Sequence, residues 1–158
     1  MEENEDEYLD PKDLPIYQKG EEIYQLVRKI ADLIPDDNER LQHTKQFMLE
    51  DAAQLMIKVA GATSAGLYDI KMEAAAIIRK SARDLMIQNH SLKMFGFKEV
   101  EYFDMVRELI EEYRLLFIEW VDSFDQWDYV IDRWDYSIPQ VSDLSTKIQM
   151  MICRGVNK

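Results

Sequence analysis

The spacing of apolar residues predicts that this chain is built from helices. In the first periodic segment the apolar positions recur at steps of seven, four, three and four residues, at Ile16, Ile23, Val27, Ile30 and Ile34. Asp13 is placed to cap a helix that has Pro15 in its first turn, and Pro35 ends it because proline cannot continue a helix. The pattern therefore predicts an amphipathic helix that ends at the IPDDN sequence.

Two further amphipathic segments follow, and glycines mark the breaks after them. Asp37 or Asn38 caps the second segment, whose apolar face consists of Leu41, Met48, Ala52, Leu55, Val59 and Ala62. The sequence GATSAG at 61–66 predicts the next break. The third segment runs from about Leu67 to Leu92 and carries two adjacent apolar stripes, as a helix with two neighbours does. The sequence KMFGFKE at 93–99 predicts the turn after it.

The fourth segment has the longest uninterrupted pattern. Its apolar residues alternate steps of three and four at Phe103, Val106, Ile110, Tyr113, Phe117, Trp120, Phe124, Trp127, Ile131 and Trp134. As one helix it would span about 55 Å, against about 30 Å for the first helix. Four such helices with short connections predict an all-α fold, an antiparallel up-down-up-down four-helix bundle over residues 14–136 with a long fourth helix.

A long fourth helix would extend beyond the first and carry apolar residues with it. Burying one tryptophan is worth a few kcal/mol, so we expect this end to be covered. Three covers remain open: the N-terminal segment with Tyr8 and Leu9, the C-terminal stretch 141–155, or another subunit.

The sequence QWDYVIDRWDY at 126–136 repeats Trp-Asp-Tyr after seven residues, which is the period of the bundle itself. On a helix its tyrosines would lie away from the tryptophan stripe. Aromatic residues on both sides predict an interaction surface formed by Trp127, Tyr129, Ile131, Trp134 and Tyr136.

Charge is unevenly placed along the chain. The net charge is −12, and residues 1–13 hold seven acidic residues against one lysine, which predicts a flexible acidic N-terminal segment. Residues 137–158 are expected to form a C-terminal tail with a short amphipathic helix. An acidic chain repels phosphate backbones, so broad nucleic-acid affinity is disfavoured. Residues 39–98 carry a net +3, however, and a cationic cluster on the third helix is the candidate nucleic-acid contact: Lys71, Arg79, Lys80 and Arg83.

No arrangement of residues in the sequence indicates catalysis, a cofactor or a metal. Di-metal bundles need Glu-x-x-His pairs, but Arg40 and Ile87 stand three residues before the two histidines. Glu73 interrupts an apolar stretch and is expected to be a partly buried carboxylate paired with a cation. We therefore expect a protein that is not an enzyme. The lone Cys153, the acidic start and the lack of a membrane-length apolar run indicate the cytoplasm.

The order of these parts resembles a bacterial family of small four-helix bundles, the proteins encoded in intervening sequences of large-subunit ribosomal RNA genes. Their relatives include the accessory proteins of diversity-generating retroelements. The resemblance lies in LPIYQKGEEIYQLVRKIADLIP, LQHTKQFMLEDAAQLMIKVAGATSAG and YDIKMEAAAIIRKSARDL and covers roughly residues 14–124. It implies an antiparallel bundle that assembles into a ring, often a pentamer. The retroelement relatives bind nucleic acid and a reverse transcriptase through basic surfaces, a role that falls here on the third-helix cations.

Two functions follow as hypotheses. The first is a non-enzymatic interaction or scaffold protein that associates with itself or with another protein through the tryptophan-rich end. The alternative is a nucleic-acid-binding adaptor that works through the third-helix cations.

Overall fold

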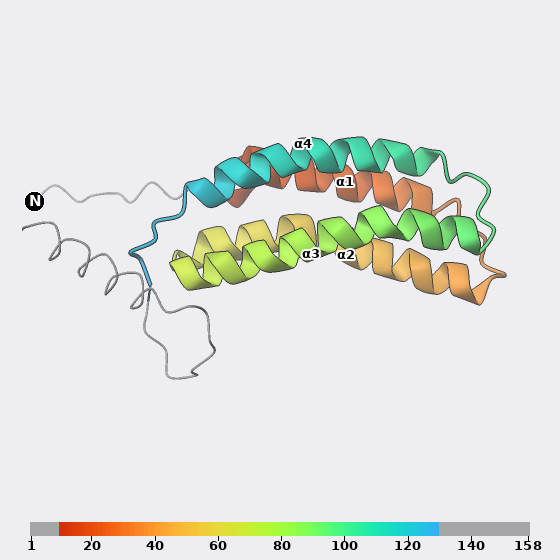
Figure 1. Cartoon of the computed structure of the whole chain (residues 1–158), viewed down its shortest axis with the longest axis horizontal. Coiled ribbons are helices and arrows are strands. Elements are labelled where there is room, and N and C mark those ends of the chain that lie inside the picture. The colour runs from red at the N-terminus through yellow and green to blue at the C-terminus, as the bar shows by residue number, and fades with distance from the viewer. Residues whose placement is uncertain (1–9, 130–158) are drawn as a thin grey trace, which may run out of the picture.

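The computed structural model of the chain describes residues 10–129. Within that range the protein is entirely helical, with four α-helices, one short 3-10 helix and no strand. In chain order the elements are η1 (Pro11–Asp13), α1 (Pro15–Ala31), α2 (Glu39–Ala65), α3 (Tyr68–Met94) and α4 (Tyr102–Asp122). The α-helices lie side by side along one long axis, and their connections alternate between the two ends of the molecule (Figure 1).

The helix boundaries follow from capping residues. Pro15 stands in the first turn of α1, as predicted, but its N-cap is Leu14 rather than Asp13, which instead closes η1. Asn38 caps α2 because its side-chain oxygen accepts hydrogen bonds from the backbone N–H groups of residues 40 and 41. Gly66 and Gly96 adopt φ of 77° and 86°, which few other residues tolerate, and they mark the turns after α2 and α3.

The predicted break at 61–66 is much shorter in the structure. The second helix continues to Ala65, so only Gly66 of the GATSAG sequence lies outside it. Gly61 is a helical residue with no atom near the position of its missing side chain.

Each helix packs against two neighbours, and the pairs differ in extent. The α2–α3 and α1–α2 contacts are the most extensive, α1–α4 is smaller, and α3–α4 is the smallest of the four. The buried apolar residues form one core along the bundle, drawn from all four helices and the turns between them: Ile16, Ile23, Val27, Ile30, Ile34, Leu41, Met48, Ala52, Leu55, Val59, Ile78, Leu85, Leu92, Phe97, Phe103, Val106, Ile110 and Tyr113.

The centre of the bundle is fixed by a close approach at the Leu55 carbonyl. A side chain on Gly20 of α1 would come within 3.2 Å of the carbonyl carbon and oxygen of Leu55 on α2. From α4, the buried Tyr113 hydroxyl donates to the same oxygen at 2.7 Å. Burial raises the pKa of the Tyr113 phenol, so it remains a protonated donor. Three helices therefore meet at one backbone group.

The prediction of a long fourth helix is wrong for the described residues. With 21 residues, α4 is shorter than α2 and α3, which have 27 each. It ends at Asp122 because side chains beyond it bond to the local backbone instead of continuing the helix. The Ser123 hydroxyl donates to the Trp120 carbonyl at 2.6 Å, and an Asp125 carboxylate oxygen accepts from the backbone N–H of Trp127 at 2.9 Å.

This ending changes the expected domain limits. The predicted overhang is much reduced in the described range, since α4 has only four residues more than α1 and is shorter than α3. The predicted acidic N-terminal segment 1–13 also overlaps the folded part, because η1 packs on α1 and α2 and its Pro11 is buried. The predicted tail at 137–158 lies outside the described residues.

Candidate functional site

Aromatic side chains gather at the end of α4 and in the loop after it. We call this the aromatic end, and it consists of Trp120, Phe124, Trp127 and Tyr129. The Trp120 and Phe124 rings meet edge to face with centroids 4.7 Å apart. Lys71 from α3 places its ammonium 5.7 Å from the centroid of the Phe124 ring, within range of a cation–π contact. Phe124 lies two residues after the last residue of α4 and is buried, so the predicted apolar seam continues past the end of the helix.

The loop after Phe124 turns its aromatic residues outward. It is attached to the start of α3 by a hydrogen bond of 2.6 Å from the Tyr68 N–H to the Asp128 carbonyl. Trp127 is 73% exposed and Tyr129 is 41% exposed. Trp127 therefore does not continue the core-facing seam of Trp120 and Phe124, as the helical pattern predicted, but points away from it.

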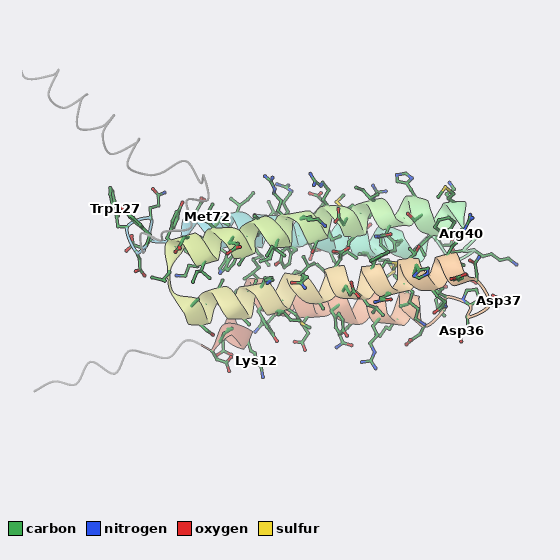
Figure 2. The ribbon with its side chains drawn as sticks, turned by 90° about the horizontal axis from the view of Figure 1, so that it is seen from below. Lys12, Asp36, Asp37, Arg40, Met72 and Trp127 are labelled. Atoms are coloured by element: carbon green, nitrogen blue, oxygen red, sulfur yellow. The ribbon has the colours of Figure 1, made fainter. Side chains whose placement is uncertain are left out.

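The remaining residues of the predicted aromatic surface are Ile131, Trp134 and Tyr136, and all three lie outside the described residues. In Figure 2, Trp127 extends beyond the ends of the helices, at the same end of the molecule as Met72 of α3. Met72 is 36% exposed. An aromatic side chain and a thioether thus lie in solvent at the end where the described chain leaves the bundle.

The third-helix cations separate into three environments. Arg79 and Arg83 are exposed and lie one helical turn apart. Lys80 instead bonds Asp84 on the same helix at 2.6 Å, and this hydrogen bond raises the pKa of the lysine. Lys71 lies over Phe124 at the aromatic end. The structure therefore keeps two of the four predicted cations together as a free pair.

The side of α3 that carries these arginines follows from its contact with α2. Ser81 is buried, and it lies close enough to Asp51 of α2 to lower the pKa of that carboxyl. Arg79 and Arg83 each stand two residues from Ser81, which places them about 200° around the helix and so on the side away from α2. Neither arginine forms a salt bridge with an acidic residue among residues 10–129.

The sequence reasoning missed two further basic residues of α3 beyond these arginines. His90 is seven residues after Arg83, which returns it to the same stripe, and Lys93 lies close to it; both are exposed. We call Arg79, Arg83, His90 and Lys93 the basic edge. The heptad spacing of Arg83 and His90 was visible in the sequence, but only the α2 contact shows which side of the helix they occupy.

A polar cluster lies between α2 and α3. Glu73, the predicted partly buried carboxylate, is exposed, whereas Asp51 of α2 is half-buried. Burial raises the pKa of the Asp51 carboxyl, and the hydrogen bond from Ser81 partly opposes that rise. Lys80 and the half-buried Asp84 also belong to this cluster, and they bond each other at 2.6 Å, so neither is placed as a free general acid or base for Asp51.

An ion pair joins α1 to α4. The Lys19 ammonium bonds Glu112 at 2.8 Å and Glu22 at 2.6 Å, and these bonds raise the pKa of Lys19. A groove beside this pair is lined by Leu26 of α1, Leu109 of α4 and charged residues of both helices. The groove contains no cluster of groups that points to a reaction.

Residues 10–129 contain no group of three or more His, Cys, Asp or Glu side chains positioned to hold a metal ion. No helix in this range has the length and apolar character to cross a bilayer.

Comparison with known proteins adds no relative: no family model, curated protein or solved structure matches the chain.

Proposed function

We propose that the chain is an antiparallel up-down-up-down bundle that serves as a cytoplasmic interaction or scaffold protein, without enzymatic activity, and associates with itself through the aromatic end. The observation that carries this proposal is the exposure of Trp127, at 73%, beside Tyr129 at 41%. Residues 14–124 also resemble intervening-sequence bundles, for which self-assembly is characteristic.

Trp127 is the most exposed side chain of the aromatic end. A tryptophan carries a large apolar surface, and burying it on association contributes a few kcal/mol. Two hydrogen bonds hold the loop that presents it, one to Asp125 and one from Tyr68 to Asp128. A preorganised loop loses little conformational freedom on binding, so most of the burial energy remains available for association.

Sedimentation velocity of the full chain tests the proposal over a range of protein concentrations. Trp127→Ala, alone and with Trp134→Ala, is expected to shift the distribution to smaller species and to weaken association by tenfold or more, about 1.4 kcal/mol. Phe47→Ala is the matched control, because Phe47 is an aromatic residue of α2 with 54% exposure. An unchanged size distribution in the tryptophan variants, or an equal loss in the control, would count against the aromatic end.

The second candidate function is nucleic-acid binding at the basic edge, favoured by the free Arg79–Arg83 pair. It predicts RNA or DNA binding that weakens steeply with salt and is reduced by replacing both arginines with alanine. Arg28→Ala serves as the control, since Arg28 is an exposed arginine on α1. No retention of nucleic acid at low salt would exclude this function.

A further inference from the structure

The basic edge and the point where the acidic N-terminal segment joins the bundle lie on opposite sides of the bundle. The basic edge lies on the side of α3 away from α2, and the N-terminal segment joins the bundle through η1, which contacts α1 and α2. Figure 2 shows this separation, with Lys12 of η1 on the α1–α2 side and the opposite side formed by α3 and α4. Residues 1–9 contain five acidic residues and no basic one.

The basic edge is itself free of acidic residues. The two acids nearest to it in sequence, Glu73 and Asp84, lie about 80° and 60° from Ser81 around α3 and so on the α2 side. Asp84 is moreover bonded to Lys80. An anionic partner at the basic edge would therefore meet Arg79 and Arg83 without a competing carboxylate from α3.

An apolar position completes this surface. Met72 precedes Arg79 by seven residues, so it lies on the same stripe of α3 two turns earlier, and it is 36% exposed. The N-terminal segment has the matching order, in which the acids at 2–7 precede Tyr8 and Leu9. An extended segment laid along α3 would pair its acids with the arginines and place an aromatic or leucine side chain near the methionine.

We propose that the acidic segment 2–9 of a second copy of this chain binds the basic edge. This inference rests on the proposed self-association and adds a second contact to it, distinct from the aromatic end. The contact is electrostatic, with five carboxylates against the charges of Arg79, Arg83 and Lys93. Screening by salt weakens it, because the side chains of the basic edge are exposed.

A second copy suits this edge better than the chain's own segment. An extended chain advances at most about 3.5 Å per residue, so the acids at 5–7 lie within roughly 10–18 Å of Asp10. Arg79 is eleven residues into α3, about 16 Å from its start, and the two rows of helices add a further 10 Å or so. The path around the end of the bundle exceeds the reach of most of these acids. A neighbouring molecule has no such limit.

We call the acidic segment 2–9 the arm. Because the arm and the basic edge are different surfaces of the same chain, their contact is heterologous. Each copy donates one arm and receives one, so copies join head to tail and form either a closed ring or an open chain. Two variants separate donor from acceptor. In the edge variant, Arg79 and Arg83 become Glu, and in the arm variant the five acids become their amides (E2Q, E3Q, E5Q, D6N and E7Q).

The experiment measures association of the full chain by sedimentation velocity at low salt. Each variant alone is expected to associate on the order of tenfold more weakly than the unchanged protein, since several exposed ion pairs are lost together. An equimolar mixture of the two variants regains a one-to-one complex, because an intact arm and an intact edge are present on different molecules. R28E on α1 is the charge-reversal control, and far-UV circular dichroism verifies that each variant is folded.

Mixing distinguishes the outcomes. If the mixture associates no more strongly than the separate variants, or if both variants associate as the unchanged protein does, the proposal is overturned. Loss of RNA binding in the edge variant with self-association intact would also overturn it, in favour of nucleic acid. If W127A leaves association unchanged while mixing still restores the complex, the aromatic end fails and the arm contact stands.

Discussion

The close approach of α1 and α2 at Gly20 predicts a loss of stability when a methyl group is added there. In Gly20→Ala, the new methyl group would lie 3.2 Å from the carbonyl carbon and oxygen of Leu55 and 3.3 Å from the nitrogen of Met56. These are helix backbone atoms that cannot rotate away, so α1 must move outward, at a cost of about 1–3 kcal/mol. Alanine is favoured over glycine in a helix by about 1 kcal/mol, which offsets part of this cost. We expect a net loss of about 1 kcal/mol in the free energy of unfolding, or about 3 °C in Tm.

Gly61→Ala is the matched control for this substitution. Gly61 also lies inside a helix, but nothing stands within 4 Å of the position its methyl group would take. Only the helix-propensity gain applies there, so this variant is expected to be more stable by about 0.5–1 kcal/mol. Urea unfolding followed by far-UV circular dichroism measures both. Equal stability of the two variants would refute the argument that α1 and α2 meet through backbone contact at Gly20.

Three more substitutions test other parts of the fold. Tyr113→Phe removes the hydrogen bond to the Leu55 carbonyl and should lower the free energy of unfolding by about 0.5–1.5 kcal/mol without changing the oligomeric state. An unchanged free energy of unfolding would mean that this bond does not contribute to stability. Asn38→Ala removes the N-cap of α2 and should lower it by about 0.5–2 kcal/mol, measured by urea unfolding beside Asn38→Asp, which keeps a capping oxygen and should lose less. Burial raises the folded-state pKa of Asp51, so the folded state holds this proton more tightly and stability falls as pH rises through the region above the ordinary value of 3.8. Asp51→Asn should flatten that part of the profile in unfolding experiments from pH 4 to 7, and an unaltered profile would contradict the assignment.

Helix positions were predictable from the sequence because they depend on local patterns. The apolar faces of the first two helices are buried as predicted, and Pro15 and Asn38 stand where the starts of α1 and α2 require them. The end of α4 was not predictable from periodicity, since Phe124 keeps the spacing of the seam although the helix has already ended. Ser123 and Asp125 were the available indication, because both residue types bond to nearby backbone and compete with helix continuation.

The candidate site depended on tertiary contacts that the sequence does not contain. The arginines of α3 were identified from spacing, but their separation from Lys80 follows from the Lys80–Asp84 bond and from the burial of Ser81 against α2. Trp127 was assigned to an interaction surface on the assumption of a helix. It is exposed for a different reason, namely the turn that Asp125 and the bond from Tyr68 to Asp128 impose.

The two proposed contacts should depend differently on salt, so a salt series can tell them apart. Association through Trp127 depends on apolar burial, so it should persist at high salt. Association through the arm and the basic edge involves exposed charges and should weaken as the Debye length falls to a few Å, at about 1 M salt. A salt series on the unchanged protein therefore ranks the contacts before any variant is made. A size distribution that does not respond to salt would assign self-association to the aromatic end, whereas dissociation by salt would assign it to the N-terminal arm.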